Sequence, residues 1–382
     1  MTRRLMEGSE AIAEAMVAAG CRFFAGYPMT PFTEVLENMA KKLPALGGVC
    51  MNAESELEAV GMAWGAAATG TRAATGSVGQ GLSLMQESLS EITLARIPLV
   101  VLNMARGQSD YYQATRGGGH GDYRHLVLAP MDIPEAVELV QLAFHWAEKW
   151  RNPVLVFGDY YLAHVYQSVD VRPIDFGPLP PRTWALDGST GGTGAAKLLS
   201  PLGDVKQRDD VGYDLQDYYT RRAAETTAMV EGEAALVETG YLEGADVVVV
   251  AYGTPGKYVR FAVQAMRAEG KSVGYVRPIS LFPFPTEAVA AAAEQARAVA
   301  VYENSMGQMV DDVRLAVLGR RPIHFIGGLT MDSSGFGIGP DNDVAIIRAR
   351  IEAVLDSVSG DSTGTSTAST GTASTSTGGS RR

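Results

Sequence analysis

Apolar segments of strand length alternate with amphipathic helical segments along most of the chain. Short apolar runs bounded by glycine or proline predict strands, whereas apolar residues three or four positions apart predict helices. Strands that alternate with helices are typical of a mostly parallel sheet covered on both faces. In the first half of the chain the pattern predicts strands over 21–26, 48–52, 71–77, 98–105 and 153–158, and helices over 31–43, 53–70, 82–96 and 132–149. Asp132 is the expected N-cap of the last helix.

The alternation stops near residue 168 and resumes at residue 246. The intervening stretch is rich in proline, glycine and charge, which indicates a connector with one helix over 218–238. The second unit is predicted to contain strands over 246–252, 272–277, 298–302 and 322–326, and helices over 257–269, 286–297, 307–318 and 343–355. The final residues are almost only serine, threonine, glycine and alanine, which cannot offset their ordering entropy.

We therefore predict an α/β fold with two doubly wound parallel-sheet domains. The first domain is expected over residues 1–170 and the second over 245–356, with a long linker over 171–244 and a disordered tail over 357–382.

Composition and charge exclude several classes of protein. No apolar run reaches the roughly 18 residues of a membrane span, and the first residues turn acidic too early for a secretory signal. The net charge of −11 argues against a nucleic-acid partner. Two cysteines cannot supply a disulfide framework, a four-cysteine zinc site or an iron–sulfur cluster. The spacing of histidines and cysteines predicts no metal site, and no Gly-x-Ser-x-Gly nucleophile elbow occurs.

Candidate chemistry lies on the loops that follow the strands, where open α/β sheets bind ligands. Thr30 precedes a proline, so it is predicted as the N-cap of the next helix or as a ligand-binding residue. Glu54, Glu56 and Glu58 open a helix, whose dipole favours carboxylates at that end. The rest of that helix is small and apolar, so one glutamate is expected to be desolvated, which suits proton transfer.

Two further loops are candidates. The stretch 76–81 is rich in glycine and opens a helix, so it could cradle an anion or let a flat ligand approach the backbone. Arg106 leaves the sheet at a strand end, where it could clamp a substrate carboxylate. His120 is interpreted as structural, because the sequence offers it no acid or base partner.

Together these residues resemble the alpha subunit of the 2-oxoacid:ferredoxin oxidoreductases, which use thiamine diphosphate. The resemblance runs in order along nearly the whole chain up to the tail. The stretch 110–124 is most similar to the branched-chain, 2-oxoisovalerate (3-methyl-2-oxobutanoate) subgroup. The motifs that carry the resemblance are Tyr27-Pro-Met-Thr-Pro31, Glu54-Ser-Glu56 followed by Gly61-Met-Ala-x-Gly-Ala-Ala-x-x-Gly70, Ser77-x-Gly-x-Gly81 followed by Leu84-Met-x-Glu87, Val250-Ala-Tyr-Gly-Thr254, Arg277-Pro-Ile-Ser-Leu-Phe-Pro283 and Glu303-Asn-x-x-Gly-Gln308.

The resemblance implies that the first domain holds the aminopyrimidine ring of thiamine diphosphate. Glu56 would be the catalytic residue: it would hydrogen bond the pyrimidine N1′ and so promote loss of the thiazolium C2 proton. Thr30 and Arg106 would bind the substrate carboxylate. The other cofactor-binding positions implied are Tyr27, Pro28, Gly79 and Gly81. The second domain resembles the transketolase C-terminal domain, with a role in assembly.

The family's redox chemistry implies partners. A beta subunit would hold the diphosphate, Mg²⁺ and a [4Fe-4S] cluster. Ferredoxin and coenzyme A would take the electrons and the acyl group, and gamma or delta subunits are possible. A cytoplasmic heterotetramer of two alpha and two beta subunits is expected. The alternatives are a 2-oxoglutarate enzyme, a non-catalytic assembly partner, and a phosphonopyruvate or sulfopyruvate decarboxylase, a class that lacks the second domain.

Overall fold

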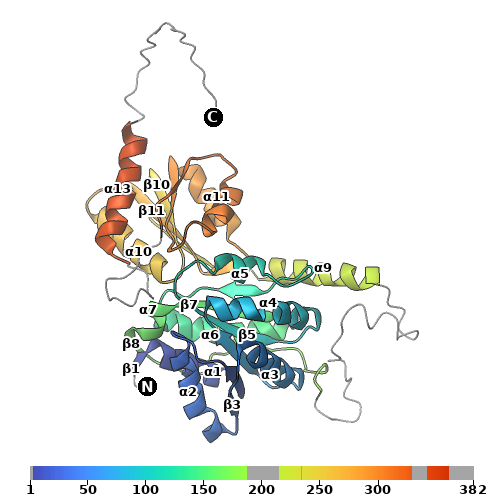
Figure 1. Cartoon of the computed structure of the whole chain (residues 1–382). Helices are drawn as coiled ribbons and strands as arrows, with labels where there is room; N and C mark the ends of the chain where they lie inside the picture. Colours follow the sequence, from blue (N-terminus) through green and yellow to red (C-terminus); the bar gives the residue numbers. More distant parts are fainter. Residues whose placement is uncertain (1–2, 187–214, 234, 329–341, 361–382) are drawn as a thin grey trace, which may run out of the picture.

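The computed structural model describes residues 3–186, 215–233, 235–328 and 342–360, and its elements form two stacked α/β units (Figure 1). In the described ranges no helix is both long and apolar enough to cross a membrane. The predicted tail lies outside the described residues from 361 onward, whereas 357–360, also assigned to the tail, continue the last helix.

The first unit is built on a seven-stranded sheet in the order β12-β6-β7-β5-β4-β2-β3. All neighbours in it are parallel except β12 and β6. Its strands are β2 (Phe23–Gly26), β3 (Val49–Asn52), β4 (Ala73–Ser77), β5 (Leu99–Ala105), β6 (Leu126–Leu128), β7 (Pro153–Asp159) and β12 (Ser280–Phe282). A separate antiparallel pair joins β1 (Arg4–Glu7) to β8 (Tyr166–Val169).

Helices cover both faces of this sheet, as predicted for a doubly wound fold. One apolar cluster joins the sheet to α1, α2 and α6, and another joins its opposite face to α3, α4 and α5. The helices of this unit are α1 (Gly8–Ala18), α2 (Thr33–Lys42), the short 3-10 helix η1 (Pro44–Leu46), α3 (Glu56–Ala68), α4 (Gly79–Leu94), α5 (Tyr111–Arg116), α6 (Ile133–Trp150) and α7 (Tyr160–His164). The side chain of Asp132 accepts a hydrogen bond from the Glu135 N–H, so the predicted N-cap of α6 is confirmed.

The second unit has a five-stranded sheet in the order β14-β13-β10-β11-β9, in which only β9 is antiparallel. Helices α10 and α13 cover one face, and α11 and α12 cover the other. The elements are β9 (Val237–Gly240), β10 (Val247–Val250), β11 (Val273–Pro278), β13 (Ala298–Val301), β14 (Ile323–Phe325), α10 (Gly253–Ala268), α11 (Thr286–Gln295), α12 (Met309–Val317) and α13 (Val344–Gly360).

Two segments differ from the sequence-based expectation because long-range strand pairing decides them. The predicted helix over 218–238 is α9 (Leu215–Gly232), and its expected end is replaced by β9, which pairs with β11. The residues of β12 lie within the second unit in sequence, between β11 and α11, but add an antiparallel strand to the first sheet. The predicted linker therefore contains a strand of the second sheet, and the second unit contributes a strand to the first.

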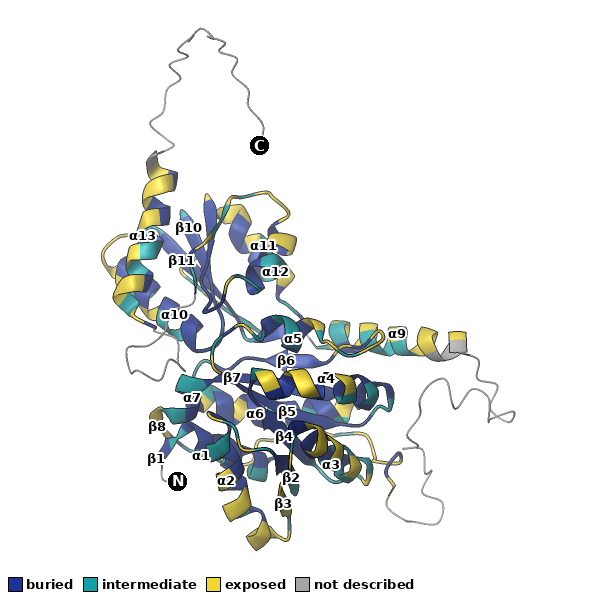
Figure 2. Cartoon of the chain, in the orientation of Figure 1, coloured by how far each residue is buried: buried dark blue, intermediate teal, exposed yellow. Residues whose placement is uncertain are grey.

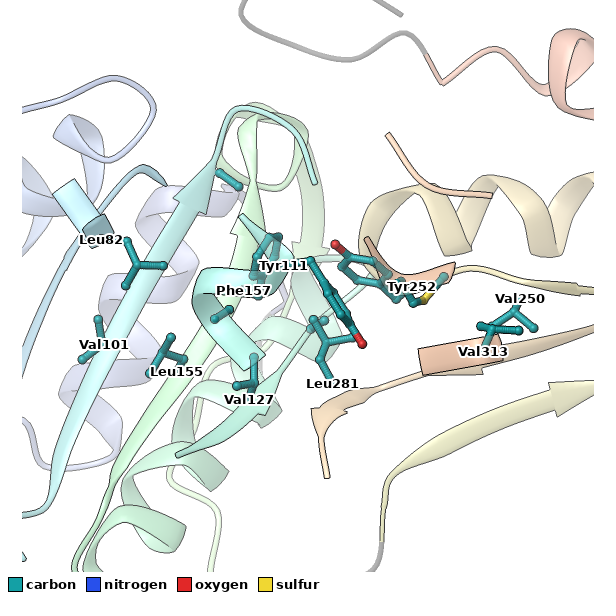
Figure 3. Close-up of a cluster of buried hydrophobic side chains, with 14 of the residues drawn as sticks. Leu82, Val101, Tyr111, Val127, Leu155, Phe157, Val250, Tyr252, Leu281 and Val313 are labelled. Carbon is teal, nitrogen blue, oxygen red and sulfur yellow. The ribbon is translucent and has the colours of Figure 1, made fainter. Parts of the chain in front are cut away.

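The two units share an apolar core. One buried cluster runs from the α3–α4 face of the first sheet to the α11–α12 face of the second (Figure 2). Tyr111, Phe157 and Tyr252 meet at its centre (Figure 3), with ring centroids 5.6 Å apart for Tyr111 and Tyr252 and 5.8 Å apart for Phe157 and Tyr252. The second unit is thereby fixed on the first through buried aromatic contacts.

Candidate active site

Four predicted loops converge at the carboxyl-end edge of the seven-stranded sheet. The parallel register aligns Gly26 at the end of β2 with Asn52 of β3 and with Gly76 of β4, while Ser77 aligns with Asn103 of β5. Each candidate loop follows directly from one of these strands. The parallel pairing thus gathers residues that are up to eighty positions apart in sequence.

Glu56 is buried at the first turn of α3. Ser55 caps this helix by accepting a hydrogen bond from the Leu57 N–H at 3.2 Å, which starts the helix at Glu56. Glu56 is only 2% exposed, and the Ser77 hydroxyl at the end of β4 donates to its Oε1 at 2.7 Å. No other hydrogen bond to the Glu56 side chain is formed within the described part of the chain, so its second carboxylate oxygen is available.

The neighbouring glutamates have different surroundings. Glu54 is exposed, and Glu58 is exposed with its carboxylate accepting a hydrogen bond from the Ser55 hydroxyl. That hydrogen bond lowers the pKa of Glu58 because it stabilises the ionised carboxylate. Glu54 and Glu58 face solvent, and Glu56 alone of the three is buried, as expected for one of these glutamates.

Positions 79 and 81 need glycine because other side chains of the protein occupy the space that a Cβ would fill. A Cβ at Gly81 would lie 2.1 Å from Ser77 Oγ and 2.4 Å from Glu56 Oε1. A Cβ at Gly79 would lie 2.1 Å from Asp110 Oδ1. The two glycines therefore let one carboxyl group each approach the start of α4.

Asp110 is a carboxyl group that the sequence analysis did not single out. It lies at the start of α5, and the Asn103 amide donates to its Oδ2 at 3.2 Å. Burial raises the pKa of Asp110, although this hydrogen bond and the nearby Arg106 oppose the rise. Ser77 belongs to the glycine-rich motif, and it becomes the partner of Glu56 through the register of β4, which the motif by itself does not indicate.

Thr30 and Arg106 are brought together from loops on two different strands. The Arg106 Nε donates to the Thr30 carbonyl at 3.1 Å, and both residues are exposed at the sheet edge. The prediction that Thr30 is the N-cap of α2 is wrong. The Met29 carbonyl accepts from the N–H groups of Phe32 and Thr33, so a turn precedes the helix, which begins at Thr33.

Tyr27 and Pro28 lie on the same loop, directly after β2. Tyr27 is half-buried and Pro28 is exposed. The space above the sheet beside them is filled by Phe32, because a Cβ at Gly26 or Gly76 would come within 2.8 Å or 2.7 Å of its ring. Phe32 is the buried residue that supports this loop.

His120 has the carboxylate partners that the sequence did not reveal. Its Nδ1 lies 3.0 Å from Glu87 Oε1, and its Nε2 lies 3.3 Å from Glu91 Oε1. The two glutamates are four residues apart on α4, so they share one face of the helix. These three residues place potential ligand atoms within 4.8 Å of one another, a grouping that the spacing of histidines and cysteines did not predict.

Two family models match the chain. Residues 14–180 match the thiamine-diphosphate-binding domain of pyruvate flavodoxin/ferredoxin oxidoreductase, and residues 245–334 match the core domain II of pyruvate:ferredoxin oxidoreductase. The first match contains all the predicted site residues, and the second contains the elements from β10 to β14.

Curated relatives and solved structures agree with these matches. The ketoisovalerate oxidoreductase subunit VorB of Methanothermobacter marburgensis is 35% identical over 83% of this chain and 90% of the relative. The 2-oxoglutarate synthase subunit KorA of the same organism is 32% identical over 84% of this chain and 93% of the relative.

Among solved structures, the 2-oxoglutarate:ferredoxin oxidoreductase of Magnetococcus marinus with 2-oxoglutarate, coenzyme A and succinyl-CoA bound aligns with a TM-score of 0.78 at 26% identity. The alignment covers 93% of this chain and 65% of that one, so this chain spans about two thirds of its length. A split-gene transketolase aligns with a TM-score of 0.58 at 15% identity and shares the fold. The resemblance seen in the sequence is thus confirmed, and the chain belongs to the 2-oxoacid:ferredoxin oxidoreductases, enzymes that oxidise 2-oxoacids with ferredoxin and that contain a thiamine-diphosphate-binding domain.

Proposed function

We propose that this chain is the pyrimidine-binding subunit of a 2-oxoacid:ferredoxin oxidoreductase that converts a branched-chain 2-oxoacid, of the 2-oxoisovalerate type, to acyl-CoA and CO2. The observation that carries the proposal is the buried carboxyl group of Glu56, held by Ser77 at the glycine-rich start of α4. Bound thiamine diphosphate would supply the electron sink for loss of CO2 from the 2-oxoacid.

The residues around Glu56 fit an aminopyrimidine ring. Glu56 Oε1 is occupied by the Ser77 hydroxyl, which leaves Oε2 to hold a proton shared with a ring nitrogen. Gly79 and Gly81 carry no side chain at the first turn of α4, so the carboxyl groups of Asp110 and Glu56 lie against that turn, and Tyr27 and Pro28 lie on the loop after β2. A buried carboxyl group with one oxygen available suits this task because it can form a hydrogen bond to the ring nitrogen that is shielded from water.

The substrate carboxylate is proposed to bind at Thr30 and Arg106. The Arg106 Nε donates to the Thr30 carbonyl. Its terminal nitrogens have no hydrogen-bond partner within the described residues, so they can make a bidentate contact with a carboxylate. An arginine fixed at one nitrogen loses less freedom when it binds, so the Thr30 contact orients the substrate site.

A partner subunit is proposed to complete the active site. Mg²⁺, the diphosphate site and a [4Fe-4S] cluster are assigned to it, since two cysteines cannot ligate such a cluster. Exposed apolar side chains on α3 and α4 offer a docking surface, with Leu57 of α3 51% exposed and Leu84 of α4 48% exposed. We propose a cytoplasmic complex of two alpha and two beta subunits, to which gamma or delta subunits can be added, with ferredoxin and coenzyme A as co-substrates.

A 2-oxoglutarate enzyme is the second candidate, supported by the similarity to KorA and to the solved 2-oxoglutarate oxidoreductase. The second carboxylate of 2-oxoglutarate would need a further cationic or hydrogen-bonding partner, whereas a branched-chain substrate would need an apolar wall. Measuring kcat/KM for 2-oxoisovalerate and 2-oxoglutarate by viologen reduction decides between them. A higher kcat/KM for 2-oxoglutarate than for 2-oxoisovalerate would overturn the branched-chain assignment.

The test of the catalytic role is Glu56→Ala in the chain co-expressed with its partner subunit. We expect kcat to fall at least about a hundredfold, which corresponds to about 2.7 kcal/mol of transition-state stabilisation. Glu54→Ala, at an exposed neighbouring carboxylate, is the matched control and is expected to retain activity. Wild-type activity in Glu56→Ala would contradict the assignment. A complex that assembles but turns over neither 2-oxoacid would favour a non-catalytic assembly role for the chain.

A further inference from the structure

Three motifs of the second unit resemble the family and are not among the proposed catalytic or binding residues, and all three contact the first unit. The Thr254 hydroxyl, in the motif after β10, donates to the buried Asp159 at 3.0 Å. Arg277, in the motif that ends β11, binds both carboxylate oxygens of Glu135 on α6 at 2.7 and 3.0 Å. The third motif, 303–308, contacts the loop that carries Arg106.

Gln108 joins this loop to the second unit. Its backbone N–H donates to the Asn304 carbonyl at 2.9 Å, and its side-chain Oε1 accepts from the Asn304 N–H at 2.8 Å. Its Nε2 donates to the Tyr252 carbonyl at 3.1 Å. Gln108 is 2% exposed, so these three hydrogen bonds are shielded from water.

Gln308 makes the reciprocal contact from the second unit. Its Oε1 accepts from the Tyr112 N–H at 2.8 Å, and its Nε2 donates to the Ser109 carbonyl at 2.6 Å. The Gln308 backbone is itself fixed, because its N–H donates to Glu303 Oε1 at 3.0 Å. Glu303 is fully buried, so it holds the Gln308 backbone in place while the Gln308 side-chain amide contacts the loop.

The following helix is attached to the second unit as well. The Tyr111 hydroxyl donates to Asp312 Oδ2 at 2.5 Å, and Arg116 binds the same carboxylate at 2.9 and 3.1 Å. The Tyr111 ring packs on Tyr252 in the shared core (Figure 3). From Gln108 to Arg116, the backbone that follows Arg106 is therefore held by the second unit.

Arg106 is only two residues from the first of these attachments. The hydrogen bonds from the second unit reach the backbone of residues 108, 109 and 112, so they determine the path of the loop itself. Without Gln308, the Ser109 carbonyl and the Tyr112 N–H would lose their partners and turn toward water. Such a shift would move the Arg106 guanidinium away from Thr30.

We propose that the second unit, through Gln308 and its contacts with Gln108, positions Arg106 to bind the substrate carboxylate. Gln308 is thus a positioning residue, and the second domain takes part in substrate binding without touching the substrate. The inference rests on the proposed carboxylate-binding role of Arg106, which the experiment below tests separately.

The experiment compares Gln308→Ala and Arg106→Met, singly and combined, in the complex with the partner subunit. Gln308→Ala removes both loop hydrogen bonds and keeps the backbone contact to Glu303. We expect the KM for the 2-oxoacid to rise about tenfold, with kcat changed less than about threefold and thiamine diphosphate affinity unchanged. Leu315→Ala, at an exposed position on α12, is the control and should leave all parameters unchanged.

The combined variant separates positioning from general destabilisation. If Gln308 acts through Arg106, then Gln308→Ala has no further effect on KM once Arg106 is replaced by methionine. Equal effects of Gln308→Ala in both backgrounds, or no effect in either, would overturn the inference while the role of Arg106 stands. An unchanged KM in Arg106→Met would instead overturn the proposed function of that arginine.

A second variant keeps the test valid if Gln308→Ala does not assemble. Gln308→Glu retains the acceptor for the Tyr112 N–H but loses the donor to the Ser109 carbonyl. Its KM is expected to lie between those of the wild type and Gln308→Ala. A wild-type KM in an assembled Gln308→Glu complex would count against the inference.

Discussion

Glu56 is buried, begins a helix, and accepts a side-chain hydrogen bond from one donor, the Ser77 hydroxyl, within the described residues. The Ser55 cap begins the helix, the apolar face of α3 removes water, and Ser77 fixes one oxygen. Any one of these features is common in proteins. Their combination leaves a desolvated carboxyl group with an available oxygen, the arrangement that proton transfer to or from a ring nitrogen requires.

Gly81→Ala tests how closely this carboxyl group is confined. The added methyl group would overlap Ser77 Oγ and Glu56 Oε1, so the pair must separate. We expect kcat to fall more than about tenfold while the unfolding temperature changes by only a few degrees. Steady-state viologen reduction and thermal unfolding of the same preparation measure both. Full activity in Gly81→Ala would show that the Glu56–Ser77 contact does not matter for catalysis.

His125 gives the stability of the chain a defined pH dependence. Burial lowers the pKa of His125 to about 4, although its Nε2 contacts the Ala114 carbonyl at 3.0 Å. The unfolded state, with an ordinary value near 6.5, binds the proton first, so stability is lost as the pH falls from 6.5 toward 4. Once the pH is below 4, the depressed pKa of His125 lowers the free energy of unfolding by about 3 kcal/mol relative to neutral pH.

His125→Gln should remove this contribution. Urea unfolding of the variant between pH 7 and pH 4 is expected to show a shallower fall in the free energy of unfolding than the wild type, by up to about 3 kcal/mol. Parallel pH profiles for the two proteins would contradict the assignment.

At the scale of elements, the N-cap of α6 could be predicted because its signal is local. Asp132 accepts from the Glu135 N–H at 3.2 Å and also lies 3.4 Å from the Lys257 ammonium. Asp132→Ala is expected to lower the free energy of unfolding by about 1 kcal/mol. Asp132→Ser keeps the cap but loses the lysine contact, so it should retain most of the stability. Equal losses in both variants, measured by urea unfolding, would assign the effect to Lys257 instead.

Other elements depend on pairing partners that are distant in the chain. The apolar pattern of 237–240 and 280–282 is compatible with several structures. These residues become β9 and β12 because the edges of β11 and β6 provide backbone partners. Similarly, α2 begins later than its threonine and proline suggested, since the Met29 carbonyl accepts from Phe32 and Thr33. Local propensity is a weak guide wherever a strand edge or a buried ring competes with it.

At the scale of the whole molecule, Arg277 links the two units. It is 3% exposed and binds Glu135 of the first unit together with Glu238 of β9. Arg277→Met would leave Glu135 without its cation and Glu238 with Arg260 alone, so we expect a loss of about 3–5 kcal/mol in the free energy of unfolding. Arg348→Met, which breaks a surface pair with Glu269, is the control and should change little.

Thermal and urea unfolding of the Arg277 and Arg348 variants provide the comparison. Because Arg277 joins the units, its variant is also expected to broaden or split the unfolding transition. A sharp transition with wild-type stability in Arg277→Met would show that the other contacts between the units hold them together without Arg277.

The sequence by itself determined the alternation of strands and helices, the existence of two parallel sheets, and the candidate residues Glu56, Thr30 and Arg106. It did so because periodicity, capping residues and glycine-rich turns act within a few positions of one another. Only the tertiary structure decided that Ser77 holds Glu56, that Glu87 and Glu91 face His120, and that Gln308 holds the Arg106 loop. These contacts depend on strand register and on the docking of one sheet against the other, which join residues up to about two hundred positions apart in sequence.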